Sequence, residues 1–216
     1  MSSPVNVLVA FYSRDGSVEA LASAIAEGAR KAGASVRLRR VRELVDEQTM
    51  RLASGWTESA ARMNDAYAAP TLDDARWADA FAFGAPTRFG SAASEPRAYF
   101  ETLGTLWLGG ELAGKAASVF TGSSSPHGGL EAAALGLYPT LAHLGLIIVP
   151  TGYGHPTLFR AGTPYGAASV SHGAERRAPT GDDLAVAAYQ GESLARVAAA
   201  LKGGRSQVVP GQPADV

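Results

Sequence analysis

Short apolar runs alternate with helical patterns along this chain. Residues 5–11 are almost continuously apolar and rich in Val, and a turn cluster follows them, which favours a buried parallel strand. Residues 18–32 then carry apolar side chains at helical spacing. The same two patterns recur to the end of the chain. They predict further strands at 36–41, 80–84, 116–120 and 146–149, and further helices at 95–103, 130–144 and 182–201.

Capping and turn residues predict where the elements end. Ser17 is the expected N-cap of the first helix, and Gly33 is its expected C-terminal stop. Pro86 is expected to end the third strand. Residues 42–79 are polar and poorly periodic, so we expect a long excursion there, and residues 151–181 form a predicted Gly/Pro-rich loop.

Strands that alternate with helices predict an α/β fold. The expected architecture is a flavodoxin-like, doubly wound, five-stranded parallel sheet of order 2-1-3-4-5, formed by a single domain at 1–202 with a tail at 203–216. Ligands of such sheets bind beyond the carboxyl ends of the strands, where the strand order reverses. The loops at 13–18, 86–91 and 121–129 are therefore the predicted site.

Composition narrows the possible functions. The 216 residues include no Cys, which excludes disulfide scaffolds, thiol catalysis, Cys-ligated zinc and Cys-held iron–sulfur clusters. A net charge of −1 argues against a general nucleic-acid coat and a polybasic membrane anchor. No apolar stretch approaches the roughly 20 residues of a membrane span. We therefore expect a cytoplasmic protein with no nucleic-acid partner and no membrane anchor.

The loop after the first strand has the features of an anion site. Backbone N–H groups at a helix start carry partial positive charge, and Gly16 allows a close approach of the ligand. Both G-x-x-x-x-G-K-[ST] and G-x-G-x-x-G are missing from it. An ordinary capped turn is the alternative. Asp15 would repel a phosphate, so it is expected to face solvent or to pair with Arg14.

The other two loops suit a flat, polar ligand. Thr87 could form a hydrogen bond with the edge of a heterocycle, Arg88 could stabilise negative charge, and Phe89 could pack on a planar ring. Residues 121–129 offer many backbone donors and little bulk. Simple polar loops remain the alternative at both places.

Competing chemistries fit less well. A serine-hydrolase elbow, G-x-S-x-G, is broken at Pro126, and the strand ends lack the acidic cluster of a phosphoacceptor domain. The His residues have no metal-ligand spacing, so no metal is predicted. His143 suits a helix C-terminus, and packing is the default role of Trp107.

Several stretches, which follow one another along the chain in the same order as in a known family, carry a resemblance to it. The most specific are Pro-Thr-Arg-Phe-Gly at 86–90 and Gly-Thr-Pro-Tyr-Gly-Ala at 162–167. Residues 7–16, 114–120, 140–143, 147–153 and 189–192 match in the same order. With these stretches the sequence resembles the WrbA-type NAD(P)H:quinone oxidoreductases, flavodoxin-like proteins that bind FMN.

The resemblance implies a role for each matched residue. His143 would reach the site, either within one subunit or from the neighbouring part of the assembly, and is the candidate catalytic group. Trp107 would line the substrate cavity. The family implies a homotetramer with sites at subunit junctions. The residues expected to bind FMN, besides His143, are Ser13, Arg14, Asp15, Gly16, Ser17, Val18, Pro86, Thr87, Arg88, Phe89, Gly90, Thr121, Gly122, Ser123, Ser124, Ser125, His127 and Gly128.

The resulting functional expectation is an FMN-dependent NAD(P)H:quinone oxidoreductase. It would reduce quinones to quinols by two electrons in a ping-pong cycle, with NADH or NADPH as donor. A flavodoxin-like electron carrier and an FMN-binding regulatory module without NAD(P)H activity are the alternatives. Such carriers are usually strongly acidic for docking, so the net charge of −1 favours the enzyme.

Overall fold

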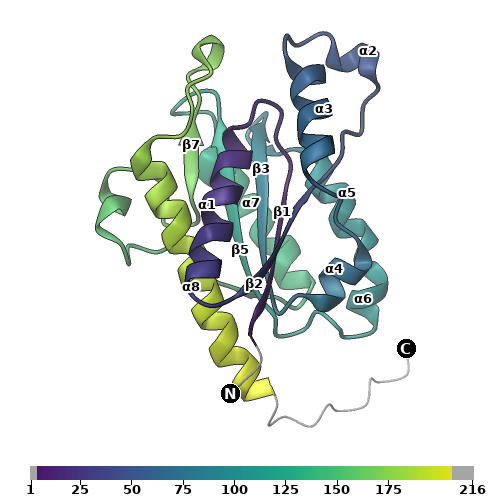
Figure 1. The fold of residues 1–216 in the computed structure, drawn as a ribbon, viewed down its shortest axis with the longest axis vertical. Helices are drawn as coiled ribbons and strands as arrows, with labels where there is room; N and C mark the ends of the chain where they lie inside the picture. The colour runs from purple at the N-terminus through teal and green to yellow at the C-terminus, as the bar shows by residue number, and fades with distance from the viewer. Residues whose placement is uncertain (1–3, 206–216) are drawn as a thin grey trace.

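A computed structural model describes residues 4–205, and Figure 1 shows their arrangement. The strands are β1 (Asn6–Phe11), β2 (Ser35–Arg40), β3 (Ala80–Arg88), β4 (Ser91–Ala92), β5 (Ala116–Ser123), β6 (Ile147–Ile148) and β7 (Ala168–Val170). The α-helices are α1 (Ser17–Lys31), α2 (Glu47–Met50), α3 (Trp56–Ala66), α4 (Leu72–Trp77), α5 (Ser94–Thr102), α6 (Gly104–Leu108), α7 (Leu130–His143) and α8 (Gly181–Arg205). Two short 3-10 helices, η1 (Pro156–Phe159) and η2 (Gly173–Glu175), complete the elements.

The main sheet is parallel, in the order β2-β1-β3-β5-β6. This confirms the predicted order 2-1-3-4-5, because the fourth and fifth predicted strands are β5 and β6. The fifth strand position is split along its length. β6 pairs with the start of β5 at Ala116 and Ala117, and β7 pairs with its end at 121–123. The prediction of a continuous loop at 151–181 is therefore wrong in part, because that region contains β7. Three residues are too few to show the alternating pattern of a strand.

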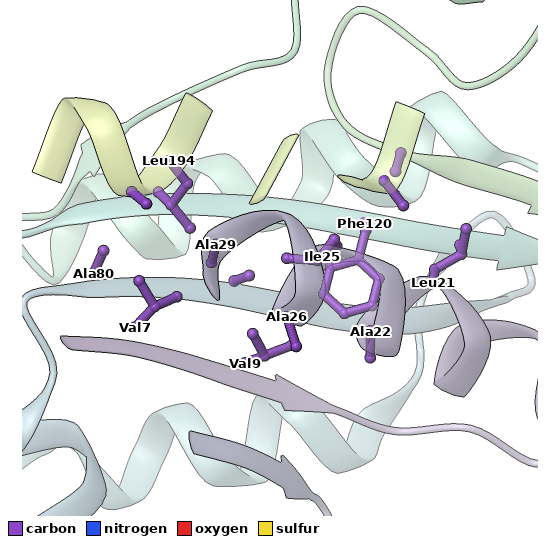
Figure 2. Close-up of a cluster of buried hydrophobic side chains, with 14 of the residues drawn as sticks. Val7, Val9, Leu21, Ala22, Ile25, Ala26, Ala29, Ala80, Phe120 and Leu194 are labelled. Carbon is purple, nitrogen blue, oxygen red and sulfur yellow. The ribbon is translucent and has the colours of Figure 1, made fainter. Parts of the chain in front are cut away.

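Helices cover both faces of the sheet. α1 and α8 pack together on one face, and α5, α6 and α7 lie on the other (Figure 1). β1 is buried on both faces, with Val7 and Val9 toward α1 and Leu8 toward the opposite core. Figure 2 shows side chains of α1, including Ile25, gathered beside Phe120 of β5. The two cores hold the carboxyl ends of the strands in register.

Three predicted boundaries need correction. Ser17 is the first residue of α1 and not its N-cap; that position belongs to Gly16, in the left-handed region at φ 98°. Pro86 does not end β3, which runs on to Arg88. β1 pairs with β3 only as far as Gly84, so no β1 carbonyl lies beside Pro86. Proline is tolerated there because its missing backbone N–H would have had no partner in β1. α8 continues to Arg205, into the tail predicted at 203–216, and residues 206–216 lie outside the described part.

The polar excursion at 42–79 folds into α2, α3 and α4. The N-terminus of α3 lies near the carboxyl end of β1, where Trp56 contacts Arg14. The excursion therefore forms one wall at the predicted end of the sheet. Within residues 4–205, no helix is long and apolar enough to cross a membrane.

Candidate functional site

Two adjoining hollows lie at the carboxyl ends of β1, β3 and β5. The inner hollow has a volume of about 80 Å³ and the outer hollow about 240 Å³. They share the lining residues Arg14, Asp15, Arg88, Ser124 and Ser171. The inner hollow is further lined by Ser17, Val18, Pro86, Thr87, Gly122 and Ser123. All three predicted loops therefore meet at one place.

The loop before α1 is closed by its own side chains. The Gly16 N–H donates to Ser13 Oγ at 3.0 Å, and the Ser17 N–H donates to Asp15 Oδ1 at 3.0 Å. The Asp15 carboxylate thus accepts a bond from a helix-start N–H, the kind of donor that anions use. Of the two expected arrangements, the structure shows the first: Asp15 is exposed to solvent, with its carboxylate on this backbone donor.

A buried arginine supports this loop from below. Arg40, at the end of β2, is fully buried and donates to the backbone oxygen of Ser13 at 3.2 Å. It also pairs with Glu43 and hydrogen-bonds to Asn64. Burial raises the pKa of Glu43, but the hydrogen bond and charge of Arg40 outweigh it and leave the pKa below its ordinary value. The start of the loop is therefore fixed by a buried ion pair.

The loop after β3 presents a desolvated cation. The Arg88 guanidinium donates to the Thr87 carbonyl at 2.7 Å, yet its buried Nε has no partner among the described residues. Burial and the nearby charge of Arg14 lower the pKa of Arg88. Phe89, at φ 50°, is fully exposed. A buried cationic N–H without an acceptor is costly, so this Nε is available to an acceptor atom of a ligand.

The loop after β5 gives the inner hollow a bare main-chain floor. A Cβ on Gly122 would lie 3.0 Å from Val18, and one on Gly128 would lie 2.8 Å from Ser123. Ser123 Oγ donates to the Ser125 carbonyl at 2.6 Å, which tightens the turn. Thr121 is buried beneath, and its hydroxyl donates to the Leu130 carbonyl at 3.3 Å. Larger side chains at these glycines would therefore collide with Val18 and Ser123, and of the two only Gly122 lines the inner hollow.

Two predicted residues lie elsewhere. His143 and Trp107 line a separate cavity of about 320 Å³, together with Arg97, Phe100, Glu101, Gly104, Thr140 and Leu144. None of these eight residues lines the inner or outer hollow. α7 leads away from the carboxyl end of β5, and its 14 residues span roughly 21 Å at 1.5 Å per residue. One chain therefore does not bring His143 to the three loops.

The sequence patterns also missed residues that the structure brings to this end of the sheet. Trp56, Ser171 and Arg176 come from the regions predicted as an excursion and a loop, and all three line the outer hollow. Arg40 lies in a strand that its alternating pattern predicts to be half exposed. Of these four residues, only Arg40 has a partner close enough in the sequence to have been predicted, because Glu43 follows three residues later.

Comparisons with known proteins give a consistent result. The family described as NADPH-dependent FMN reductase matches residues 4–155. A protein of Rhizobium rhizogenes named NAD(P)H dehydrogenase (quinone) is 40% identical over 200 residues, which cover 90% of this chain and 98% of the relative.

Solved structures share the fold. One described as the flavodoxin, WrbA-like protein from Agrobacterium tumefaciens superposes with a TM-score of 0.64 at 21% identity, covering 91% of this chain and 98% of that one. A flavodoxin from the domain Archaea superposes with a TM-score of 0.57 at 16% identity, covering 90% and 99% of the two chains.

Proposed function

The chain belongs to the NADPH-dependent FMN reductase family, and we propose that it is an FMN-dependent NAD(P)H:quinone oxidoreductase. The observation that carries this proposal is the 40% identity to the NAD(P)H dehydrogenase (quinone) along almost the whole length of that relative. It agrees with the resemblance found in the sequence motifs. The two hollows lie where doubly wound sheets bind ligands, which supports the same conclusion.

The residues of the inner hollow suit FMN. A phosphate needs backbone donors at a helix start, and residues 13–18 supply them. A flat ring system needs a surface free of bulky side chains, and Gly122 contributes main chain without a side chain to the lining of the inner hollow. The unpartnered Nε of Arg88 needs an acceptor, and FMN carries several. FMN supplies two-electron transfer between NAD(P)H and a quinone when it is bound.

The protein's own contribution is binding and orientation. Residues 13–18 would hold the phosphate, with Asp15 turning from the Ser17 N–H to release that donor. Thr87 and Arg88, which line the inner hollow, would hold the ribityl and ring portions together with the exposed Phe89. The buried Arg40 keeps the Ser13 backbone in place. The further members of the predicted set, Pro86, Gly90, Thr121, Ser123, Ser124, Ser125 and His127, belong to the same two loops.

His143 and Trp107 require a second subunit in this proposal. Their cavity lies apart from the loops, and Trp107 remains 53% exposed. In a homotetramer with sites at subunit junctions, a neighbour would supply Trp107 to line the quinone cavity and His143 to donate a proton to the quinone oxygen that becomes the quinol hydroxyl. We further propose a cytoplasmic location.

An anaerobic titration tests the function. The protein is loaded with FMN and desalted, its flavin absorbance is recorded, and NADH or NADPH and then benzoquinone are added. Absorbance that bleaches with the nucleotide and returns with the quinone is the expected result. Retained flavin that ignores both nucleotides would instead identify an electron carrier. If no flavin is retained, an equilibrium FMN titration separates weak binding from none, and none would refute the proposal.

A further inference from the structure

The outer hollow gathers positive charge beside the inner hollow. Arg14, Arg88 and Arg176 line it, and Asp15 is the one carboxylate among the described residues that do so. Asp15 and Glu95 exert opposing charge on Arg88, yet burial and Arg14 still lower the pKa of Arg88. Three guanidinium groups around one space of about 240 Å³ repel one another unless an anion joins them.

Among residues 4–205, Arg14 is held in place by aromatic contacts and forms no ion pair with an acid. Its guanidinium carbon lies 3.6 Å from the ring centroid of Trp56, and its Nε donates to Tyr12 Oη at 3.4 Å. Burial raises the pKa of Tyr12 to about 12, so the hydroxyl is neutral near pH 7 and does not offset the charge. The Arg14 charge is therefore available to a ligand.

Arg176 is held by a strained loop. It lies in the left-handed region at φ 46°, as does His172 at φ 56°, and it donates to the Ser54 carbonyl. A Cβ on Gly55 would lie 2.8 Å from Arg176 Nη1, so the missing side chain makes room for the guanidinium. The other non-Gly residue at positive φ in the described chain is Phe89, in the flavin loop. Such strain clusters at ligand sites.

The hollow also faces the start of a helix. Ser54, Gly55 and Trp56 line it, and α3 begins at Trp56 and runs for 11 residues. Its N-terminal partial positive charge adds to that of the three arginines. Every strong electrostatic feature of the outer hollow except Asp15 therefore favours a phosphate.

We propose that the outer hollow is the subsite for the 2′-phosphate of NADPH, with Arg176 as its main ligand and Arg14 as its second. This rests on the proposed function. Arg14 and Arg88 line both hollows, whereas Arg176 lines only the outer hollow. The pyrophosphate, which is nearer to the nicotinamide, would therefore meet Arg88, and the more distant 2′-phosphate would meet Arg176, with Arg14 beside it. The enzyme accordingly prefers NADPH to NADH.

Arg176→Ala tests this subsite against the matched variant Arg177→Ala. Arg177 is the next residue, but its side chain pairs with Glu175 and does not line the hollow. With the FMN-loaded enzyme and benzoquinone, Arg176→Ala should raise the KM for NADPH about 10- to 100-fold, as expected for a lost charged hydrogen bond, and leave the KM for NADH within about twofold. Arg177→Ala should change neither constant, and Arg176→Lys should restore part of the NADPH affinity.

Calorimetry with 2′,5′-ADP and 5′-AMP gives a readout independent of turnover. The wild type should bind 2′,5′-ADP more tightly, and Arg176→Ala should abolish the difference. A wild type that uses both nucleotides equally would overturn the inference, as would an equal loss for NADH and NADPH, which would assign Arg176 to the pyrophosphate. If neither nucleotide bleaches the flavin, the proposed function fails, and the calorimetry still decides whether the phosphate subsite exists.

Discussion

The two hollows and the Trp107 cavity differ in how they are built. The hollows use backbone turns and arginines from β1, β3 and distant loops, and a buried ion pair supports them. The Trp107 cavity is formed by α5, α6 and the end of α7, and Leu106 and Phe100 pack into the apolar core beside it. The first region is assembled within one chain, whereas the second exposes a tryptophan at its rim.

This difference indicates how the work is divided. Anion recognition needs fixed donors, which a single chain can position through turns and ion pairs. An exposed aromatic side chain beside a cavity is suited to closing a site that another surface supplies. The comparison therefore predicts that changes in the first region act on cofactor affinity, and changes in the second act on quinone turnover through the assembly.

Replacing the buried arginine should give the largest effect. Arg40→Ala leaves Glu43 buried without its cation, so we expect a loss of about 3–5 kcal/mol in the free energy of unfolding, together with weaker FMN binding. Leu103→Ala, beside the Trp107 cavity, should cost roughly 2–5 kcal/mol and leave FMN affinity unchanged. Urea unfolding and FMN fluorescence titration measure both. Equal effects on FMN binding would remove the distinction between the regions.

The same ion pair should give a pH signature. The pKa of Glu43 in the folded protein lies below its ordinary value of 4.5, so its contribution to stability is complete above that pH and is lost as the pH falls through the folded value. Unfolding free energies between pH 6 and 3 should therefore decline more steeply for the wild type than for Glu43→Gln. Parallel curves would mean that Glu43 does not control this loss.

His143→Ala tests whether the second region belongs to a neighbour's site. Loss of a proton donor should slow quinone reduction about 100-fold while flavin reduction by the nucleotide is unchanged. Coexpression with Arg88→Ala, under separate tags and at an FMN concentration that leaves most Arg88→Ala sites empty, should recover turnover above that of either variant alone, because a mixed junction regains one complete site. Mixed assemblies without recovery would contradict sites built at subunit junctions.

Arg88→Ala should weaken FMN binding about 10-fold, because it removes a charged donor from the inner hollow. Arg196→Ala is the matched control, since that arginine is exposed on α8 and pairs with Glu192. Fluorescence titration of the apoprotein gives both dissociation constants. Full affinity in the Arg88 variant would show that the loop after β3 does not hold FMN.

The smallest effect is expected at Asp15. Asp15→Asn removes a carboxylate from the helix-start N–H that a phosphate would use, so the FMN dissociation constant should fall about fivefold, which corresponds to roughly 1 kcal/mol for one charge in water. Asp73→Asn makes the same charge change far from the hollows and should have no effect on FMN affinity. A weaker affinity in Asp15→Asn would mean that Asp15 orders the loop instead of opposing the ligand.

The sequence by itself determined the order of the five sheet positions, the main helices between them and the loops that meet at the site. Continuous apolar runs such as residues 5–11 mark buried strands, and helical spacing marks the helices between them, because both patterns depend on neighbours a few residues apart. Parallel connectivity then leaves few sheet orders to choose from. The loops after β1, β3 and β5 followed directly from that order.

Only the tertiary structure decided what surrounds those loops. Arg176 reaches the Ser54 carbonyl across 122 positions, and Arg40 reaches the Ser13 carbonyl across 27. Neither contact can be predicted from hydrophobic periodicity, because each depends on how segments far apart in the sequence pack together. β7 is likewise a strand only because the end of β5 offers it unpaired backbone groups. His143 is separated from the loops by the length of α7, which runs away from the carboxyl end of β5 and has His143 as its last residue.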